Sequence, residues 1–474
     1  MLLDKVIKYF GKECLLNKTE PIIVGVSGGA DSLCLLDLLS KAGYQLIIAH
    51  FNHGIREESI VEAVYVENIG LSKGIKVFQG ASSVPEHAHS QSLSLEESAR
   101  ILRYKFLFDQ AIKFDAQAVA VAHNADDQVE TILMHLLRGT GLNGLTGMTF
   151  HELPNPWNQD IPLVRPLLKI SRKEIDFYCI KNNIEPVLDR TNLDIRYLRN
   201  YLRHQIIPRM EELSPGFGDR IGRMVELLKA DQEVLEKLTE KVWRSILLEQ
   251  GVDFICIKVR SLKEHPIGLQ RRLIRRGIKE ITKNLTDIDY DIVDRIRVAA
   301  YRQVSGQEVD VGHGLKALIE GQRLFIAYWE SKLPTHFWPQ IGHEIKVPIG
   351  EVIQLGRKWK FEIKWVEDIG QAITAALKNQ DPNVVWLDPR EQIKTLTIRN
   401  RQPGDRFQPL GMAGQSMKIS DYMINQKIPK RARKHWPLIC INEKIAWIVG
   451  KQLGESFRLS KNTRRVIKFT IYSE

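Results

Sequence analysis

The stretch Pro21–Ser32, which reads P-I-I-V-G-V-S-G-G-A-D-S, decides the fold of the chain that follows it. Its first apolar residues have the pattern of a buried strand, and leucines at helical spacing begin at Leu33. Between strand and helix, two adjacent glycines let backbone N–H groups approach an anion closely, and the helix start adds its own unpaired N–H groups. We therefore predict that Ser27-Gly28-Gly29-Ala30-Asp31-Ser32 is a phosphate-binding turn.

This turn differs from the two most familiar phosphate-binding motifs. The chain has neither G-x-x-x-x-G-K-[ST] nor G-x-G-x-x-G at this position. The S-G-G-x-D-S string after a strand instead resembles the pyrophosphate-binding loop of the ATP pyrophosphatases, enzymes that adenylate a substrate oxygen. The plainer alternative is a strand-to-helix turn capped by Ser and Asp. The paired glycines with two serines favour the phosphate site, in which Asp31 holds a metal or serves as a fixed negative charge.

Residues 1 to about 212 alternate between strand and helix patterns, which is typical of a parallel α/β sheet. We predict its strands over Ile22–Val26, Gln45–Phe51, Ile75–Gln79 and Ala118–Ala122. In such sheets ligands bind beyond the carboxyl ends of the strands. Polar residues gather at three of these ends, namely Ser27–Ser32, His50–Arg56 and His123–Asp127. Their placement indicates a functional site at this edge of the sheet.

Two arginines on the helix predicted over Leu95–Phe114 are candidates for phosphate binding. Arg100 and Arg103 are three residues apart and share a helical face, so both could reach one phosphate group. The alternative is a solvated charged face with a Glu96–Arg100 pair, and spacing alone does not decide between them.

Three carboxylates lie near the start of the helix after the fourth strand. Asp127 and Glu130 lie one turn apart, and Asp126 belongs to the same first turn. Carboxylates at a helix start often serve only as partners of the helix dipole. Three so close together, next to His123, better fit a site for Mg²⁺ or an ammonium group. Zinc is disfavoured, because His123 has no cysteine or second histidine at useful spacing.

A basic segment follows Asp189-Arg190-Thr191-Asn192. Arg196, Arg199 and Arg203 are spaced to form one stripe on a helix, which suits the phosphates of a nucleic acid. A solvated basic face is the alternative.

Two linkers, Leu213–Gly218 and Leu333–Pro339, divide the chain into three predicted domains. The first is an α/β nucleotide-binding domain with a parallel sheet over residues 1–213. The second is a mostly helical domain over residues 219–330. The third is a small α+β domain over residues 334–474.

The charge of the chain indicates a polyanionic partner. The formal net charge is +11 and the pI is about 9.2, which makes nucleic acid the first candidate and an RNA-indifferent basic enzyme the alternative. Residues 390–474 hold 18 Lys and Arg against 6 Asp and Glu, so the excess charge lies in the C-terminal domain. Four aromatic residues interleave with these charges and suggest base stacking: Phe407, Tyr422, Trp436 and Trp447.

The cysteines and the apolar runs indicate the cellular compartment in which we expect the protein. None of the five cysteines forms a C-x-x-C pair, which argues against a zinc ribbon, a redox pair or a secreted disulfide framework. The N-terminus mixes charges into its apolar residues, unlike a signal peptide. No apolar run approaches the ~20 residues of a membrane span. We expect a cytoplasmic protein without membrane contact.

Taken together, the motifs resemble the tRNA(Ile)-lysidine synthetase family. The matching strings are S-G-G-A-D-S, F-N-H-G-I-R, E-E-S-A-R-x-x-R-Y, A-H-x-x-D-D-Q-x-E-T, R-G-T-G-L-N-G-L-x-G-M, R-P-L-L and D-x-T-N…R-N-x-x-R. R-N-R-Q-P-G-D-R-F-x-P-L-G, with Lys418 after it, resembles the family's terminal module. The resemblance touches both ends of the chain and is weakest in the middle.

The resemblance implies ATP-dependent ligation of lysine to C2 of the wobble cytidine in a tRNA(Ile) with a CAU anticodon. The cytidine O2 is first adenylated, and the products are lysidine, AMP and pyrophosphate. ATP and Mg²⁺ are the implied cofactors, and the tRNA and free lysine are the implied partners. The sequence is compatible with a homodimer but does not decide the oligomeric state.

The resemblance also implies roles for the candidate residues. Ser27, Gly28, Gly29, Ala30, Asp31 and Ser32 would bind ATP together with Arg100 and Arg103. Asp31 would be catalytic and would hold Mg²⁺ through the phosphates. Asp127 and Glu130 would bind the α-ammonium of lysine, and His53 or His123 would be the base. The tRNA would contact Arg196, Arg199, Arg203, Arg399, Arg401, Arg406 and Lys418.

Two other functions stay open on the sequence. A tRNA thiolase of the same loop superfamily needs catalytic cysteines, often paired, whereas those in this chain are isolated. An RNA-binding protein regulated by a nucleotide would also combine the loop with the basic C-terminal domain.

Overall fold

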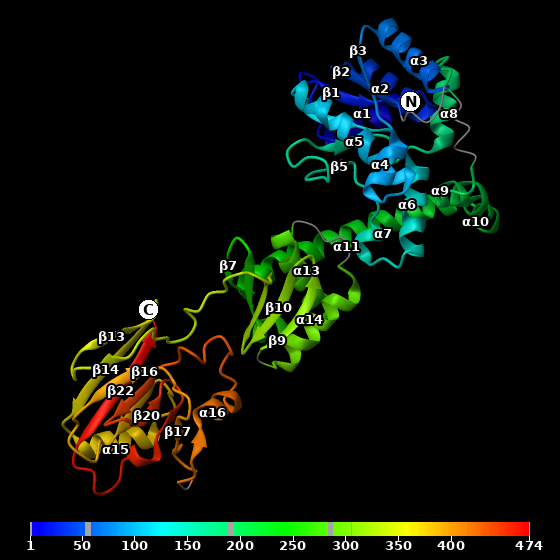
Figure 1. Ribbon diagram of the computed structural model, residues 1–474. Helices are drawn as coiled ribbons and strands as arrows, with labels where there is room; N and C mark the ends of the chain where they lie inside the picture. Colours follow the sequence, from blue (N-terminus) through cyan, green and yellow to red (C-terminus); the bar gives the residue numbers. More distant parts are fainter. Residues whose placement is uncertain are drawn as a thin grey trace. The chain divides into compact units, whose positions relative to one another are not determined.

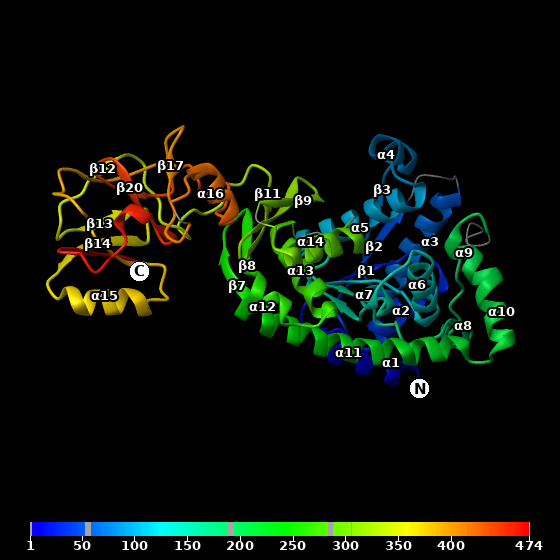
Figure 2. The same cartoon turned by 90° about the horizontal axis from the view of Figure 1, so that it is seen from below.

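The computed structural model describes residues 2–52, 58–187, 194–282, 288–304, 306–412 and 414–473. The chain forms two compact units, residues 1–236 and 237–474. Each unit has its own sheets, shown in Figures 1 and 2, and its own hydrophobic cores. The three-domain division expected from the sequence stays a prediction.

The first unit is built on a six-stranded sheet of order β3-β2-β1-β4-β6-β5. Neighbouring strands are parallel except for the last pair, β6 and β5. The strands are β1 (Ile22–Gly25), β2 (Leu46–Asn52), β3 (Lys76–Ala81), β4 (Ala118–Ala120), β5 (His151–Glu152) and β6 (Leu163–Val164). The four strands predicted from the sequence are therefore confirmed, with ends that differ by one or two residues.

Helices cover both faces of this sheet. Successive residues of each strand point to opposite faces, so each strand contributes side chains to two cores. Val24 and Ile48 belong to one core, with α2 (Ala30–Lys41) and α8 (Arg172–Lys181). Ile23 and Ala49 belong to another core, with α5 (Leu95–Lys113). Figure 2 shows β1 and β2 between α2 and α5. Burial on both faces explains why these strands are continuous apolar runs.

The remaining helices of the first unit are α1 (Leu2–Lys12), α3 (Glu58–Lys73), α4 (Val84–Gln91), α6 (Ala125–Leu137), α7 (Leu142–Leu145), α9 (Leu198–Tyr201) and α10 (Ile207–Leu213). A π-helical turn, Leu202–Ile206, joins α9 to α10. The long helix α11 (Phe217–Ile246) runs from the first unit into the second.

The strand order reverses between β1 and β4. The chain proceeds from β1 through β2 to β3 on one side and then returns to place β4 on the other side of β1. Ligands of doubly wound sheets bind at such a reversal, outside the carboxyl ends of the strands. Ser27–Ser32 follows β1 and His123–Asp127 follows β4, so the topology brings these two segments together.

The second unit begins with helices and an antiparallel sheet of order β7-β8-β11-β10-β9. Its strands are β7 (Leu247–Gln250), β8 (Phe254–Lys258), β9 (Gln307–Gly312), β10 (Leu315–Glu320) and β11 (Arg323–Tyr328). Its helices are α12 (Val259–Lys263), α13 (Ile267–Thr282) and α14 (Tyr290–Arg302). The helices were expected from the sequence, whereas the sheet is an addition to that expectation.

The C-terminal part of this unit holds two further sheets, of five and four strands. One consists of β12 (Ile345–Lys346), β16 (Leu396–Arg399), β19 (Leu438–Ile441), β20 (Lys444–Ile448) and β21 (Gln452–Leu453). The other consists of β13 (Val352–Leu355), β14 (Trp359–Val366), β22 (Val466–Ser473) and β15 (Val384–Leu387). A short ladder pairs β17 (Arg406–Phe407) with β18 (Met417–Lys418), and two helices complete the unit, α15 (Ile369–Lys378) and α16 (Ile419–Asn425).

One buried ion pair links the two parts of the second unit. Arg431 donates to both carboxylate oxygens of Glu320, at 2.8 and 2.7 Å, and also to the carbonyls of Leu333 and Pro334. Glu320 is only 2% exposed. Removing Arg431 would leave a buried carboxylate without its partner, which is strongly destabilising.

Candidate active site

The turn after β1 has the geometry of an anion cradle. Gly28 has φ +88°, a conformation that side-chain-bearing residues rarely adopt. The loop is held by its own serine, since Ser32 Oγ donates to the Gly29 carbonyl at 2.9 Å and accepts from Ser27 N at 3.2 Å. Gly29 is the N-cap of α2 and provides no side-chain cap. The first-turn N–H groups of a helix that starts in this way are available to an anion.

Asp31 stands in the first turn of α2 and is tied to two other elements. Its Oδ1 accepts from Asn124 Nδ2 at 2.9 Å, and its Oδ2 pairs with the guanidinium of Arg172. Burial raises the pKa of Asp31 above its ordinary value, against the opposing charge of Arg172. Arg172 was not among the residues expected in the site. It opens α8 within a Ser171–Glu174 capping box.

Asn124 connects the loop to the predicted lysine site. It is the N-cap of α6 and forms a reciprocal capping box with Asp127. The Asn124 backbone N–H donates to Asp127 Oδ2 at 3.0 Å, while its side chain reaches Asp31. Asp31 and Asp127 are thus fixed relative to each other through one buried asparagine, 3% exposed.

Asp127 and Glu130 form a partly buried ion-pair cluster with two arginines of the basic segment. Arg199 Nε and Arg203 Nε each donate to Glu130, both at 2.6 Å. The Nη2 groups of the same arginines donate to Asp127 Oδ1, both at 3.1 Å. Glu130 has a side-chain exposure of 1%. Burial alone would raise the pKa of Asp127, but Arg199 and the other positive groups around it hold that pKa below its ordinary value.

This cluster joins two sets of residues that the sequence assigned to different partners. Arg199 and Arg203 were expected on one stripe with Arg196, facing tRNA. In the structure Arg196 pairs instead with Asp194 and its side chain is 87% exposed. The π-helical turn that includes Arg203 interrupts the regular helical spacing on which the stripe was predicted.

His123 lies beside this cluster and has a charged neighbour of its own. Its Nδ1 accepts a hydrogen bond from Arg165 Nε at 3.3 Å. Burial lowers the pKa of His123 to about 3; Asp127 opposes this shift, whereas Arg165, Arg199 and Arg103 add to it. His123 is therefore neutral at physiological pH. His53, the other candidate base, lies outside the described residues.

The two arginines of α5 both lie over the ring of Tyr104 but differ in their polar partners. Arg100 lies 4.0 Å from Glu97, and about half of its side chain is exposed. Arg103 lies over the ring of Tyr104, and its Nε is buried without a hydrogen-bond partner among the described residues. An unpaired buried donor of this kind is costly unless a ligand accepts from it, so Arg103 is the stronger of the two phosphate candidates.

The four C-terminal residues expected to bind tRNA also fall into two groups. Arg399 forms a bidentate pair with Asp405, and Arg406 donates to Ser416. Both arginines therefore hold the local fold. Arg401 and Lys418 line a pocket of about 270 Å³ and have no partner among the described residues. The aromatic residues expected to stack on bases are in the core, each at most 5% exposed: Phe407, Tyr422, Trp436 and Trp447. That stacking prediction is wrong, because Phe407, Tyr422 and Trp436 fill the core beside α16 and Trp447 fills the core between the two C-terminal sheets.

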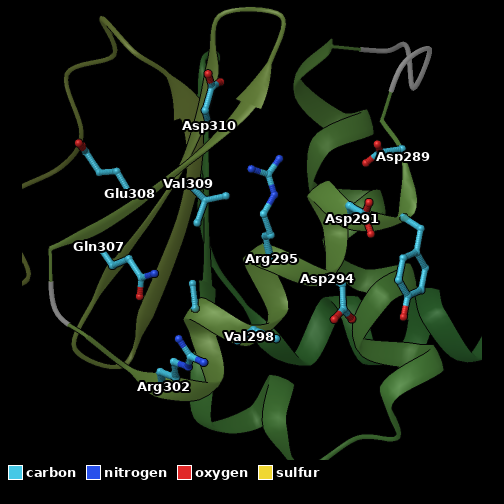
Figure 3. Close-up of a pocket in the computed structure, with 12 residues that line it drawn as sticks. Asp289, Asp291, Asp294, Arg295, Val298, Arg302, Gln307, Glu308, Val309 and Asp310 are labelled. Atoms are coloured by element: carbon cyan, nitrogen blue, oxygen red, sulfur yellow. The ribbon is translucent and has the colours of Figure 1, made fainter.

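A larger open pocket, of about 810 Å³, lies between α14 and β9 (Figure 3). Two of its five acidic side chains are in ion pairs. Asp294 pairs with Arg271 and Arg297, and Glu308 pairs with Lys316. Arg295 points between the helix and the strand in Figure 3. The pocket has charged walls but no arrangement comparable to the loop and cluster of the first unit.

Two further observations concern metals and membranes. Within the described ranges, no group of three or more His, Cys, Asp or Glu side chains is arranged to hold a metal ion. Asp31 can still supply one carboxylate ligand, and Mg²⁺ is often bound by one or two carboxylates plus substrate phosphates. No helix in the described part of the chain is long and apolar enough to cross a membrane.

The chain is similar to known protein families over most of its length. Residues 3–210 match the PP-loop domain family, and residues 396–469 match the TilS substrate C-terminal domain. The tRNA(Ile)-lysidine synthase of Dehalococcoides mccartyi is 32% identical over 99% of this chain and 98% of its own length. That of Clostridium perfringens is 33% identical over 98% of both chains. A solved U34-tRNA thiolase, NcsA from Methanococcus maripaludis, is 22% identical and covers 48% of this chain and 78% of its own, with a TM-score of 0.40.

Proposed function

The chain belongs to the tRNA(Ile)-lysidine synthase family, and on that premise we propose that it ligates lysine to C2 of the wobble cytidine of a tRNA(Ile) with a CAU anticodon. ATP first adenylates the cytidine O2 and releases pyrophosphate. The lysine ε-amine then attacks C2, forming the C–N bond and losing a proton, and the C2–O bond breaks to release AMP. The observation that carries the proposal is the full-length match to relatives whose name states this activity, together with the joining of the loop to the carboxylate cluster through Asn124.

The loop and its neighbours would bind ATP. The backbone N–H groups of the Ser27–Ser32 loop that open α2 would hold the leaving pyrophosphate, and the serine hydroxyls would keep the loop in its shape. Arg103, with its unpaired buried Nε, would neutralise charge on the triphosphate, and Arg100 would assist from a more exposed position. A Mg²⁺ ion, when bound, neutralises phosphate charge, and Asp31 is the residue that would hold it.

The cluster of Asp127, Glu130, Arg199 and Arg203 would bind lysine by its α-amino and α-carboxyl groups. The cluster contains two carboxylates and two guanidiniums and is therefore already neutral. A lone ammonium would make it positive, whereas the zwitterionic end of an amino acid is itself neutral. The α-ammonium would bind to Asp127 and Glu130, and the α-carboxylate would pair with a guanidinium. This leaves the ε-amine free to lose its proton and react.

The tRNA would be bound mainly by the second unit. Arg401 and Lys418 are unpaired among the described residues and share one pocket, so they would contact phosphates directly. Arg196, exposed on the first unit, would add another phosphate contact. Arg399 and Arg406 would support this surface rather than touch RNA. We place the reaction in the cytoplasm, where the tRNA pool is, and the homodimer stays a prediction.

The competing functions make different predictions. A thiolase uses cysteine thiols at its active site, whereas all five cysteines of this chain are free and buried. A nucleotide-regulated RNA-binding protein would bind tRNA without changing it.

Incubation of the purified chain with radiolabelled lysine, ATP and total tRNA separates the three functions. Lysine incorporated into RNA, and digested to a single modified nucleoside, is the expected result. Tight tRNA binding without incorporation would favour the RNA-binding protein. Incorporation of sulfur from a labelled donor would favour the thiolase.

A further inference from the structure

Arg165 is a buried arginine that contacts three separate groups next to the site. It is 5% exposed and follows β6. Its guanidinium donates to the carboxylate of Glu152 at 2.6 Å and to the carbonyl of Thr149 at 3.1 Å. Its Nε–H donates to Nδ1 of His123 at 3.3 Å. Arginine has no acceptor and stays protonated in proteins, so every one of these partners must accept.

This contact fixes the position of the proton on His123. A neutral imidazole carries one proton, on Nδ1 or on Nε2, and the other nitrogen is an acceptor. Because Nδ1 accepts from a permanent donor, the proton must reside on Nε2. A second proton on Nδ1 would set two N–H groups against each other.

The Nε2–H group is available to a ligand. His123 is half-buried, and no described residue accepts a hydrogen bond from its Nε2. The next residue along the chain is Asn124, which bonds both Asp31 and Asp127. The ring is therefore held at the junction of the loop and the carboxylate cluster, where ATP and lysine would meet under the proposed function.

From this geometry we propose that His123 acts in the ligation as a neutral hydrogen-bond donor through Nε2, and that Arg165 is the positioning residue that keeps it in this form. The proposal rests on the proposed function for the identity of the substrate. A neutral imidazole donor suits a substrate oxygen that gains negative charge. The cytidine O2, as its bond to C2 breaks, and an α-phosphate oxygen are of this kind. His123 does not take the proton of the lysine ε-amine, and that role passes to His53 or to another group.

The tautomer is tested without any substrate by two-bond ¹H–¹⁵N correlation spectra of the full chain labelled with ¹⁵N-histidine. The His123 signal is identified by its absence in H123Q. We expect the Nε2–H pattern at pH 7, with no titration down to pH 5.5. In R165K the signal should move toward a mixture of tautomers and titrate near the ordinary histidine pKa. If R165K does not fold, E152Q is the second variant. It weakens the ion pair between Glu152 and the Arg165 guanidinium and should shift the His123 signal in the same direction.

A matched control is available in the second unit. Arg431 also donates to one carboxylate and to backbone carbonyls, so R431K should lower stability while leaving the His123 signal unchanged. An Nδ1–H pattern in the unsubstituted chain, or an unchanged His123 signal in a folded R165K, would overturn the proposal. Because these spectra contain no substrate, failure of lysine ligation would refute the proposed function alone.

The role in the reaction is tested by two substitutions of His123 itself. Glutamine places an N–H donor near the position of Nε2 but cannot take up a proton, whereas alanine provides neither function. We expect H123Q to retain at least about tenfold more kcat than H123A. R165K should lower kcat about 10- to 100-fold with little change in the KM for ATP. Equal loss of kcat in H123Q and H123A would contradict the donor role.

Discussion

The loop Ser27–Ser32 and the cluster of Asp127, Glu130, Arg199 and Arg203 lie at neighbouring strand ends, yet they prepare for their ligands in opposite ways. The loop satisfies its own serines and leaves the N–H groups of a helix start open. The cluster pairs two carboxylates with two guanidiniums before any ligand arrives. The loop is thus preformed for an anion. The cluster would bind a zwitterion, whose ammonium would pair with the carboxylates and whose carboxylate would pair with a guanidinium. Each prediction below tests one side of this contrast.

The largest effect is expected at the loop. Replacing Asp31 by Asn should lower the rate of AMP transfer to tRNA about 100-fold, because the carboxylate that would hold Mg²⁺ against the phosphates is lost. The rate is measured as pyrophosphate release with saturating tRNA.

Asp37 provides a matched control on the same helix. It is buried and pairs with Lys41, Lys73 and Tyr178, far along α2 from the loop. Asp37→Asn should lower Tm while leaving the rate within a few-fold of the unsubstituted chain. A rate for Asp31→Asn similar to that for Asp37→Asn would mean that Asp31 is structural.

A substitution in the cluster should change the KM for lysine more than it changes kcat. Glu130→Gln removes one charge that would bind the lysine α-ammonium, and charged hydrogen bonds of this kind contribute about 1.5–3 kcal/mol. We expect the KM for lysine to rise about 10- to 100-fold and the KM for ATP to change little. Steady-state kinetics with each substrate varied in turn measure this. An equal rise in both KM values would show that the cluster only supports the fold.

A smaller effect is expected for tRNA binding. Arg401→Glu together with Lys418→Glu should weaken tRNA affinity about tenfold at 0.15 M salt and should reduce the slope of log K against log salt. Lys8→Glu with Lys12→Glu makes the same change in net charge on an exposed helix of the first unit. Filter binding over a salt series compares the two variants. If both lower affinity equally, the net charge of the chain and not this pocket binds the tRNA.

The smallest effect concerns the stability of the fold below neutral pH. Burial lowers the pKa of His123 to about 3 in the folded chain, whereas it is about 6.5 in the unfolded chain. Below pH 6.5 the unfolded chain therefore binds a proton that the folded chain does not. The stability contributed by neutral His123 is present above pH 6.5 and is lost as the pH falls toward 3.

When the pH falls from 7 to 5.5, the free energy of unfolding should decrease by about 1 kcal/mol more in the unsubstituted chain than in H123Q, because glutamine does not titrate in this range. Chemical denaturation at a series of pH values measures the difference. Parallel stability profiles for the two chains would show that His123 titrates normally in the fold.

Much of the first unit could be predicted because its residues satisfy local rules. The apolar runs of β1 and β2 are buried on both faces, and Gly28 takes a positive φ, which glycine adopts readily. The capping box at Ser171 also follows from local spacing. The strand order then brings Ser27–Ser32 and His123–Asp127 to one edge, as parallel topology requires.

The rest depended on contacts between distant segments, which spacing does not reveal. Arg199 and Arg203 had the spacing of a phosphate-binding stripe, but they meet Asp127 and Glu130 about 70 residues away in sequence. Arg165 was noted in the sequence only as part of the R-P-L-L string. Its hydrogen bond to His123 requires β4 and β6 to be adjacent, which the string does not indicate. Trp436 and Trp447 lie among basic residues in sequence but are buried, because the charged neighbours point outward while the rings fill the core.

The measurement that tests the central claim most directly is pyrophosphate release from ATP by the full chain in the absence of lysine. With a tRNA(Ile) transcript carrying a CAU anticodon, we predict release in an amount close to one equivalent per enzyme-bound tRNA, with none when the wobble cytidine is replaced by uridine. No release with the CAU transcript, or equal release without any tRNA, would contradict adenylation of the cytidine at the Ser27–Ser32 loop.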